Sequence, residues 1–208
     1  MRLFDEPTVI APGAFLLPHF ALPEEAAILA AIRTIAEQAP FRHMHTPGGQ
    51  KMSVAMTNCG PLGWVTDRKG YRYSPVDPQT NEPWPAMPEI FLNLAASAAA
   101  SAAFANFLPD ACLINRYEPG AKMSLHQDKD ELDFGEPIVS VSLGLPAIFL
   151  FGGFARGDKS ERIPLEHGDV VVWGGPARLR YHGILPLQSG EHSIAGRHRY
   201  NLTFRRAQ

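Results

Sequence analysis

Lys122-Met123-Ser124-Leu125-His126-Gln127-Asp128 is an alternating stretch that ends on a His-x-Asp pair. Apolar and polar residues take turns up to His126, a pattern that predicts an extended strand with one buried face. Successive side chains of a strand point to opposite faces, so His126 and Asp128 are expected on the same side. The imidazole and the carboxylate can therefore share one ion.

A second histidine follows another alternating segment, Arg178-Leu179-Arg180-Tyr181-His182. Two imidazoles and one carboxylate on one side of a metal ion are the ligand set of non-haem Fe(II) oxygenases, which leave the opposite positions free. A lone His-x-Asp pair is a weak signal, because such pairs are also common on solvated loops. The chain order and the strand-rich context of His126, Asp128 and His182 favour the metal site.

The segment Arg199-Tyr200-Asn201-Leu202-Thr203-Phe204-Arg205 alternates in the same way. Its polar residues share one face, and its aromatic or apolar residues share the other. Two guanidinium groups are costly to bury unless each meets an anion, and a dicarboxylate such as 2-oxoglutarate would offer one carboxylate to each. Taken alone, the segment fits the solvated face of an edge strand better.

Composition allows one sizeable core. The chain has 208 residues, 45% of them hydrophobic, and a formal net charge of −2. This length favours a single domain over residues 1–208, and the charge offers no overall attraction to nucleic acid, so a polyanion would need a local basic patch. Cys59 and Cys112 are too few for a disulfide framework. Without a signal-peptide pattern or an apolar run of about 20 residues, a cytoplasmic protein with no membrane contact is expected.

The residue pattern predicts two helices followed by many short strands. One helix should begin near Pro23-Glu24-Glu25 and end before Pro40, and another should span about Pro88 to Phe104. The predicted strands are Cys112–Tyr117, Lys122–His126, Ile138–Leu143, Ala147–Phe151, Arg162–Leu165, Asp169–Trp173, Leu179–His182 and Arg199–Arg205.

Turn signals separate these strands at the spacing of a sandwich or jelly roll. The expected fold is therefore α+β: a double-stranded β-helix, or jelly roll, over about residues 111–205, buttressed by the N-terminal helices. Residues from about 45 to 85 are rich in Gly, Pro and aromatic residues, and loops of that size are usually lids or binding elements.

The chain resembles the bacterial AlkB dioxygenases, and the resemblance covers nearly its whole length. The blocks that carry it are Thr46-Pro47-Gly48-Gly49, Met52–Gly60, Tyr73-Ser74-Pro75, Asn115-Arg116-Tyr117, Leu125–Asp130, Val139–Gly144, Gly168–Gly175, Tyr181-His182-Gly183 and Arg199–Arg205. These long blocks are far more specific than the spacing of the metal ligands.

What the resemblance implies is oxidative demethylation of N-alkylated bases, chiefly 1-methyladenine and 3-methylcytosine, in DNA and as a further candidate in RNA. The cofactor is Fe(II), and 2-oxoglutarate and O2 become succinate and CO2 while formaldehyde is released. By motif, His126, Asp128 and His182 would hold iron, and Asn115, Tyr117, Arg199, Asn201 and Arg205 would hold 2-oxoglutarate.

The resemblance also implies a nucleotide-recognition lid. Its substrate contacts would be Trp64, Tyr71, Arg72, Tyr73, Asp130 and Arg156. Without the resemblance, Asp130 would be read as a solvated acid, Trp64 as a packing residue, and Arg156 as either a phosphate contact or ordinary surface charge. The chain departs from the family pattern at Gln50, where a tyrosine is expected, which puts one lid contact in doubt.

Two other functions compete with base demethylation. The same scaffold can serve a hydroxylase of a protein side chain or of a tRNA modification. A non-catalytic module that recognises damaged bases is the alternative from another class, although such a module needs neither intact metal ligands nor two arginines. The expected partner is alkylated single-stranded or double-stranded DNA, with RNA open, and no pattern indicates an assembly larger than a monomer.

Overall fold

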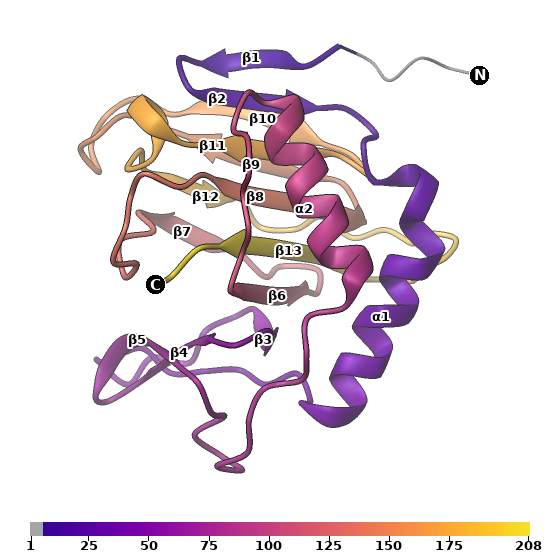
Figure 1. Ribbon diagram of the computed structural model, residues 1–208, viewed down its shortest axis with the longest axis vertical. Coiled ribbons are helices and arrows are strands. Elements are labelled where there is room, and N and C mark those ends of the chain that lie inside the picture. The colour runs from indigo at the N-terminus through magenta and orange to yellow at the C-terminus, as the bar shows by residue number, and fades with distance from the viewer. Residues whose placement is uncertain (1–5) are drawn as a thin grey trace.

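The computed structural model describes residues 6–208, so the first five residues of the predicted domain lie outside the described part. Its strands form antiparallel sheets of seven, four and two strands. The two larger sheets lie face to face, and α1 and α2 cover the outer side of the larger one (Figure 1). The fold is thus a jelly roll backed by helices, as the sequence predicts.

The seven-stranded sheet has the order β1-β2-β11-β8-β13-β6-β3. Its strands are β1 (Thr8–Ala11), β2 (Ala14–Leu17), β3 (Ala55–Cys59), β6 (Ala111–Tyr117), β8 (Ile138–Gly144), β11 (Val170–Trp173) and β13 (Arg199–Arg205). Residues at the two ends of the chain thus meet in one sheet, and β13 lies between β8 and β6 near its middle.

The other two sheets complete the jelly roll and its rim. The four-stranded sheet has the order β10-β9-β12-β7 and contains β7 (Met123–His126), β9 (Ala147–Phe151), β10 (Glu161–Leu165) and β12 (His182–Ile184). The third sheet is the hairpin of β4 (Gly63–Asp67) and β5 (Gly70–Ser74), which lies beside the open edge of the jelly roll (Figure 1).

Both helices form where the sequence predicts them. A 3-10 turn at Leu22–Glu24 leads into α1 (Glu25–Gln38), and α2 (Glu89–Ser101) begins directly after Pro88. Proline suits a helix start because its missing N–H has no partner there in any case. The alanines of α2 that face the sheet, such as Ala98, are fully buried, so small side chains bring this helix close to the strands.

Strand β13 divides its side chains between two cores. Leu202 and Phe204 pack with residues of α1, α2, β6 and β8 on the helix side of the sheet. The opposite face points between the two larger sheets, where Phe149, Phe151 and Trp173 belong to the second core. The alternation predicted for this strand is confirmed.

One predicted strand is wrong, and it concerns a candidate metal ligand. His182 begins β12 rather than ending a strand at Leu179–His182, because Gly175–Ala177 form a 3-10 turn and the chain reaches His182 through a loop. Asp128 lies beyond the end of β7, so strand alternation does not explain its orientation. The predicted lid is also less separate than expected, because β3 within it pairs with β6 in the larger sheet.

The hairpin of β1 and β2 was missing from the sequence prediction. Its turn contains Pro12 and Gly13, and Gly13 has φ of 81°, which suits the third position of a type II turn. The Pro-Gly pair between two apolar runs was the available signal. Among residues 6–208, neither helix is long and apolar enough to cross a membrane.

The contact between α2 and β13 gives a test of the core. Phe91 is fully buried and meets Phe204 edge to face, with ring centroids 5.8 Å apart. Phe91→Ala should lower the free energy of unfolding by about 3–5 kcal/mol in urea denaturation, because the lost contacts leave a cavity. The control is Val9→Ala, at a side chain that is 64% exposed, which should change it by less than about 0.5 kcal/mol. Equal effects of the two changes would contradict this description of the core.

Candidate active site

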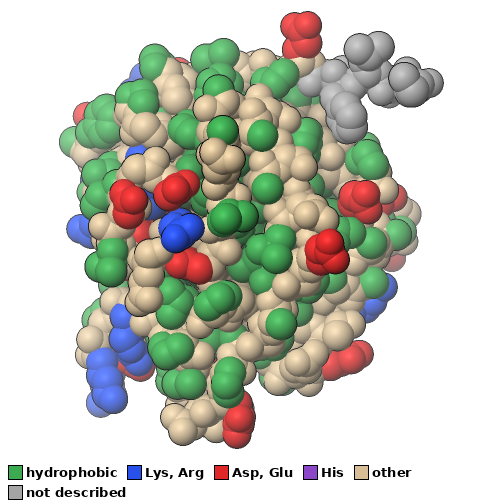
Figure 2. Space-filling view, viewed as in Figure 1, with side chains coloured by type: hydrophobic (Ala, Val, Ile, Leu, Met, Phe, Trp, Pro, Cys, Tyr) green, Lys and Arg blue, Asp and Glu red, His purple; other side chains and the backbone are tan. Residues whose placement is uncertain are grey.

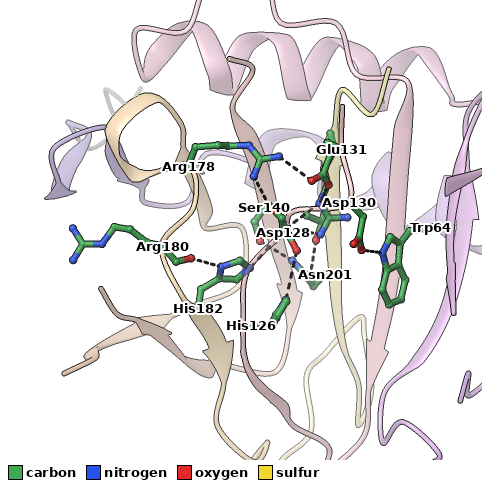
Figure 3. A network of polar contacts seen from close by, with 12 residues as sticks. Trp64, His126, Asp128, Asp130, Glu131, Ser140, Arg178, Arg180, His182 and Asn201 are labelled. Atoms are coloured by element: carbon green, nitrogen blue, oxygen red, sulfur yellow. Dashed lines mark hydrogen bonds and ion pairs between the residues drawn. The ribbon is translucent and has the colours of Figure 1, made fainter. Parts of the chain in front are cut away.

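The three predicted metal ligands come from neighbouring ends of β7 and β12. His126 ends β7 and pairs in register with His182, which begins β12. The Nε2 atoms of His126 and His182 lie 3.6 and 3.7 Å from the carboxylate oxygens of Asp128. All three donor atoms lie within 4.8 Å of one another, so the group could hold one metal ion (Figure 3).

Backbone carbonyls fix the orientation of both imidazoles. The Nδ1 atom of His126 is 2.9 Å from the carbonyl oxygen of Ser124, and that of His182 is 3.1 Å from the carbonyl oxygen of Arg180. With Nδ1–H donating to a carbonyl, Nε2 keeps its lone pair and faces Asp128. Burial, reinforced by the charge of His126, lowers the pKa of His182 to about 3, so this ring is neutral at physiological pH, as a metal ligand must be.

The carboxylate of Asp128 is only 9% exposed and faces the guanidinium group of Arg205. Arg205 donates two hydrogen bonds to its Oδ2 atom, from Nε at 2.9 Å and from Nη2 at 2.6 Å. Burial alone would raise the pKa of Asp128, but the charge and the hydrogen bonds of Arg205 outweigh it and hold the pKa well below its usual range. The carboxylate is therefore ionised.

The inward face of β13 lines the pocket beside this group, together with three residues of β6, two of which are predicted to hold the co-substrate. Asn115 is the register partner of Asn201, and Tyr117 is the partner of Arg199. Asn115 donates to the side-chain oxygen of Asn201 at 3.1 Å, and Asn201 donates to the hydroxyl of Ser140 at 2.9 Å. All five residues predicted to hold the co-substrate, including Arg205, thus line one pocket with the candidate metal ligands.

Arg199 is a buried cation whose donors are only partly satisfied. Its side chain is 1% exposed, lies over the ring of Tyr117, and donates from Nη2 to the hydroxyl of Ser142 at 2.9 Å. Its Nε and Nη1 atoms are buried without a hydrogen-bond partner among residues 6–208. Burial lowers the pKa of Arg199, since the protein supplies too little compensation for the charge. These free donors fit a carboxylate in the pocket.

Arg205 differs from the expectation that each guanidinium needs an external anion. Besides Asp128, it has Glu131 at 3.3 Å from its Nε atom. The reason is the loop after β7, which brings two acids to the end of β13 and could not be placed from the sequence. Arg205 is thus ion-paired within the protein, whereas Arg199 has no ion pair among residues 6–208.

The β4–β5 hairpin carries most of the predicted substrate contacts. Trp64 and Tyr71 stack with ring centroids 5.7 Å apart, and Trp64 donates from its indole nitrogen to Asp130 at 2.8 Å. The hydroxyl of Tyr73 donates to Glu131 at 2.6 Å. The structure therefore brings Trp64, Tyr71, Tyr73 and Asp130 together beside the loop that follows Asp128, and these four residues are called the rim below.

The remaining residues of the lid prediction are more scattered. Arg72 lies on the other face of the hairpin and pairs with Asp67 at 2.8 Å, and its hydrogen bond lowers the pKa of Asp67 to about 2. Arg156 is exposed, donates to the carbonyl oxygen of Leu125 next to His126, and lies over the ring of Tyr181. Gln50 is exposed, and its backbone N–H donates to the side-chain hydroxyl of Thr46.

Two buried residues at the site were missed by sequence reasoning. Glu131 carries no signal in the sequence beyond its place among the charged residues Lys129, Asp130 and Glu131, yet its side chain is 2% exposed. Arg178 was named only as the start of the alternating segment before His182, yet its Nη1 atom donates to the carbonyl oxygen of Asp128 at 2.8 Å. Neither lies on a regular element, so no periodic signal could reveal that they face inward.

Comparisons with known proteins agree with this geometry. A family model described as the 2OG-Fe(II) oxygenase superfamily matches residues 13–205. The α-ketoglutarate-dependent dioxygenase AlkB of Escherichia coli (strain K12) is 63% identical, over 95% of this chain and 92% of that protein. The Arabidopsis thaliana protein named DNA N(6)-methyladenine demethylase ALKBH1C is 30% identical, over 95% of this chain and 49% of that protein. The solved structure of OsALKBH1 matches with a TM-score of 0.83 at 30% identity, over 96% of this chain and 99% of that one.

The family match and the identity to AlkB both extend across the jelly roll, the pocket and the hairpin. The chain is an enzyme that uses Fe(II), 2-oxoglutarate and O2. It belongs to the 2OG-Fe(II) oxygenase superfamily and, within it, to the AlkB family of dioxygenases.

Proposed function

We propose that this dioxygenase removes alkyl groups from N-alkylated bases of nucleic acid, with 1-methyladenine and 3-methylcytosine in DNA as its main substrates. Formaldehyde is the product from a methyl group, and 2-oxoglutarate and O2 are converted to succinate and CO2. The observation that carries the proposal is the buried Arg199, two of whose donors have no hydrogen-bond partner among residues 6–208, in the same pocket as a group of two imidazoles and one carboxylate.

In this proposal, His126, Asp128 and His182 hold Fe(II). Their chemistry supports the assignment, because Nε2 of His182 is free to coordinate and Asp128 is ionised. When bound, iron and 2-oxoglutarate supply an oxidant that hydroxylates a C–H bond. The protein's part is to hold the ligands in place, through the carbonyls behind the two histidines and the guanidinium behind the carboxylate.

For the co-substrate, Arg199 is the proposed partner of the carboxylate far from the metal, with Asn115, Tyr117, Asn201 and Arg205 around the remainder. Arg199 is rigidly held by Ser142 and Tyr117, so its free Nε and Nη1 atoms keep a fixed direction. A carboxylate that meets them gains charge-assisted hydrogen bonds and compensates the buried charge. Water alone would leave that charge uncompensated.

On the substrate side, the stacked Trp64 and Tyr71 offer an aromatic platform for a base that has left its duplex. A lesion on the Watson–Crick edge weakens pairing, so such a base is displaced at lower cost. Asp130 at the rim would attract the positive charge of 1-methyladenine or 3-methylcytosine. The Arabidopsis relative, named a DNA demethylase, supports methylated nucleic acid as the substrate class.

A local basic patch could attract nucleic acid although the chain as a whole has a negative net charge. Lys and Arg side chains gather over the β4–β5 hairpin (Figure 2), where Arg68 and Lys69 at the tip are exposed. Together with Arg72 and the exposed Arg156, they are proposed to meet phosphates of the strand that carries the lesion. A peptide substrate would have less use for them, so this patch favours nucleic acid over a protein side chain.

Compartment and assembly complete the proposal. Cys59 and Cys112 face each other across β3 and β6 and are both free thiols. Unlinked cysteines in such positions suit a reducing compartment, so we place the enzyme in the cytoplasm and expect it to act as a monomer.

The metal assignment is tested by His126→Ala. His126 is half-buried at the end of a strand, so its loss should leave the melting temperature close to that of the wild type while binding of Fe(II) and turnover are lost. The matched control is His198→Ala, whose side chain is 34% exposed against 36% for His126. Iron content after anaerobic loading and gel filtration gives the measurement. Equal iron in both variants would contradict the role of His126.

The co-substrate assignment is tested by Arg199→Gln. The Kd of 2-oxoglutarate should rise at least tenfold, about the factor expected for the loss of a charge-assisted hydrogen bond of about 1.5–3 kcal/mol. Anaerobic titration of the visible band of the Fe(II) complex measures this Kd. Arg162→Gln, at an exposed arginine of β10, serves as the control. If the Kd of Arg199→Gln matches that of the control, the carboxylate lies elsewhere.

The substrate is tested by comparing initial rates in air on four pools: 3-methylcytosine oligodeoxynucleotides, the same oligonucleotides in duplex, methylated tRNA, and peptides. Formaldehyde should form from the DNA pools in step with succinate, and chelation of iron should stop both. Succinate without formaldehyde from any nucleic acid, or faster turnover of peptides, would refute the proposed substrate while leaving the dioxygenase assignment intact.

A further inference from the structure

Two hydrogen bonds join the β4–β5 hairpin to the loop that follows the candidate metal ligand Asp128. Trp64 of β4 and Tyr73 of β5 are register partners, so their side chains share one face of the hairpin. Trp64 donates to Asp130 at 2.8 Å, and Tyr73 donates to Glu131 at 2.6 Å. A cross-strand pair of the hairpin is thus linked to two consecutive acids.

The two acids point in opposite directions. Asp130 is exposed at the rim, where Trp64 contacts it (Figure 3). Glu131 is buried between two guanidinium groups, with Oε2 at 3.1 Å from Nη2 of Arg178 and Oε1 at 3.3 Å from Nε of Arg205. One acid therefore faces the substrate side, and the other faces the co-substrate side.

Glu131 extends the connection from the hairpin to Asp128. Arg205 contacts Glu131 and also holds the carboxylate of Asp128, while Arg178 contacts Glu131 and donates to the carbonyl oxygen of Asp128. From the hydroxyl of Tyr73, a continuous series of polar contacts thus reaches both the side chain and the backbone of Asp128. A shift of the hairpin that pulls on Tyr73 must act on this series.

The charges in this group are balanced and nearly sealed from water. Two carboxylates, of Asp128 and Glu131, face two guanidiniums, of Arg178 and Arg205, and each residue is at most 9% exposed. Moving one member of a buried group of charges leaves its partners uncompensated, so such a group changes position together. The hydroxyl of Tyr73 is the contact from the hairpin to Glu131 in this group.

We propose that Glu131 is a positioning residue that couples the hairpin to the co-substrate pocket. Closure of the hairpin over nucleic acid holds Tyr73 on Glu131, and Glu131 keeps Arg205 in place for 2-oxoglutarate. The enzyme therefore binds 2-oxoglutarate more tightly when nucleic acid is bound, and nucleic acid more tightly when 2-oxoglutarate is bound. This coupling rests on the proposed function, which makes nucleic acid with an alkylated base the ligand of the hairpin. By linkage, each ligand must strengthen the binding of the other by the same factor.

The experiment uses the full chain with Fe(II) under anaerobic conditions. The Kd of 2-oxoglutarate is measured from the visible band of the complex, with and without a saturating 3-methylcytosine oligonucleotide. In the wild type, the oligonucleotide should lower this Kd at least about fivefold, the lower end of ordinary coupling between sites. In Tyr73→Phe the ratio should fall to near one, while the Kd without oligonucleotide stays close to that of the wild type.

The control for Tyr73→Phe is Tyr200→Phe, which removes a hydroxyl from the helix-facing side of β13, where the ring contacts Phe41 and His198. It should keep the wild-type ratio. Glu131→Gln should lose the coupling and also raise the Kd without oligonucleotide, because Arg205 loses a counter-charge. A merely structural role would lower the melting temperature of these variants and leave the ratio unchanged, and that result would overturn the proposal.

Hydrogen exchange of the amides of residues 63–74 tests the same coupling without nucleic acid. Binding of 2-oxoglutarate should slow this exchange in the wild type and in Tyr200→Phe, but not in Tyr73→Phe. If the oligonucleotide fails to bind at all, the proposed substrate is wrong, whereas the exchange result still decides the coupling. Exchange that does not respond to 2-oxoglutarate in the wild type would overturn it.

Discussion

The ionised carboxylate of Asp128 is the constraint on which the site depends, because a buried negative charge must be compensated on every side. Arg205 approaches it from β13, and the two imidazoles approach it from β7 and β12. These groups belong to both larger sheets, so the charge is compensated only when the sheets face each other at their correct separation. The geometry of the metal site therefore depends on the packing of the two sheets of the jelly roll.

The larger sheets supply different chemistry to the space between them. The four-stranded sheet brings His126 and His182, which offer imidazole nitrogens, and the seven-stranded sheet brings Arg199 and Arg205, which offer positive charge. A dicarboxylate that chelates the metal with one end would thus place its other carboxylate on the guanidinium group of Arg199. The helices contribute by packing against Leu202 and Phe204, which fixes the rotation of β13 and so the direction of its arginines.

Much of this arrangement could be predicted from the sequence because it follows strand alternation. The two faces of β13 are a direct consequence of period two, and long blocks of residues similar to a known family placed the ligands. Prediction failed where the chain leaves regular structure. Asp128, Glu131 and Arg178 lie in loops, where side-chain direction depends on contacts between distant segments. The early hairpin of β1 and β2 was missed because its strands are short, although Pro12 and Gly13 marked the turn.

A crystal structure of the anaerobic complex with Fe(II) and 2-oxoglutarate tests the central claim most directly. The account predicts iron bonded to Nε2 of His126, Nε2 of His182 and one oxygen of Asp128, with the far carboxylate of 2-oxoglutarate on the Nε and Nη1 atoms of Arg199. Iron held by other residues, or a co-substrate whose far carboxylate points away from Arg199, would contradict it.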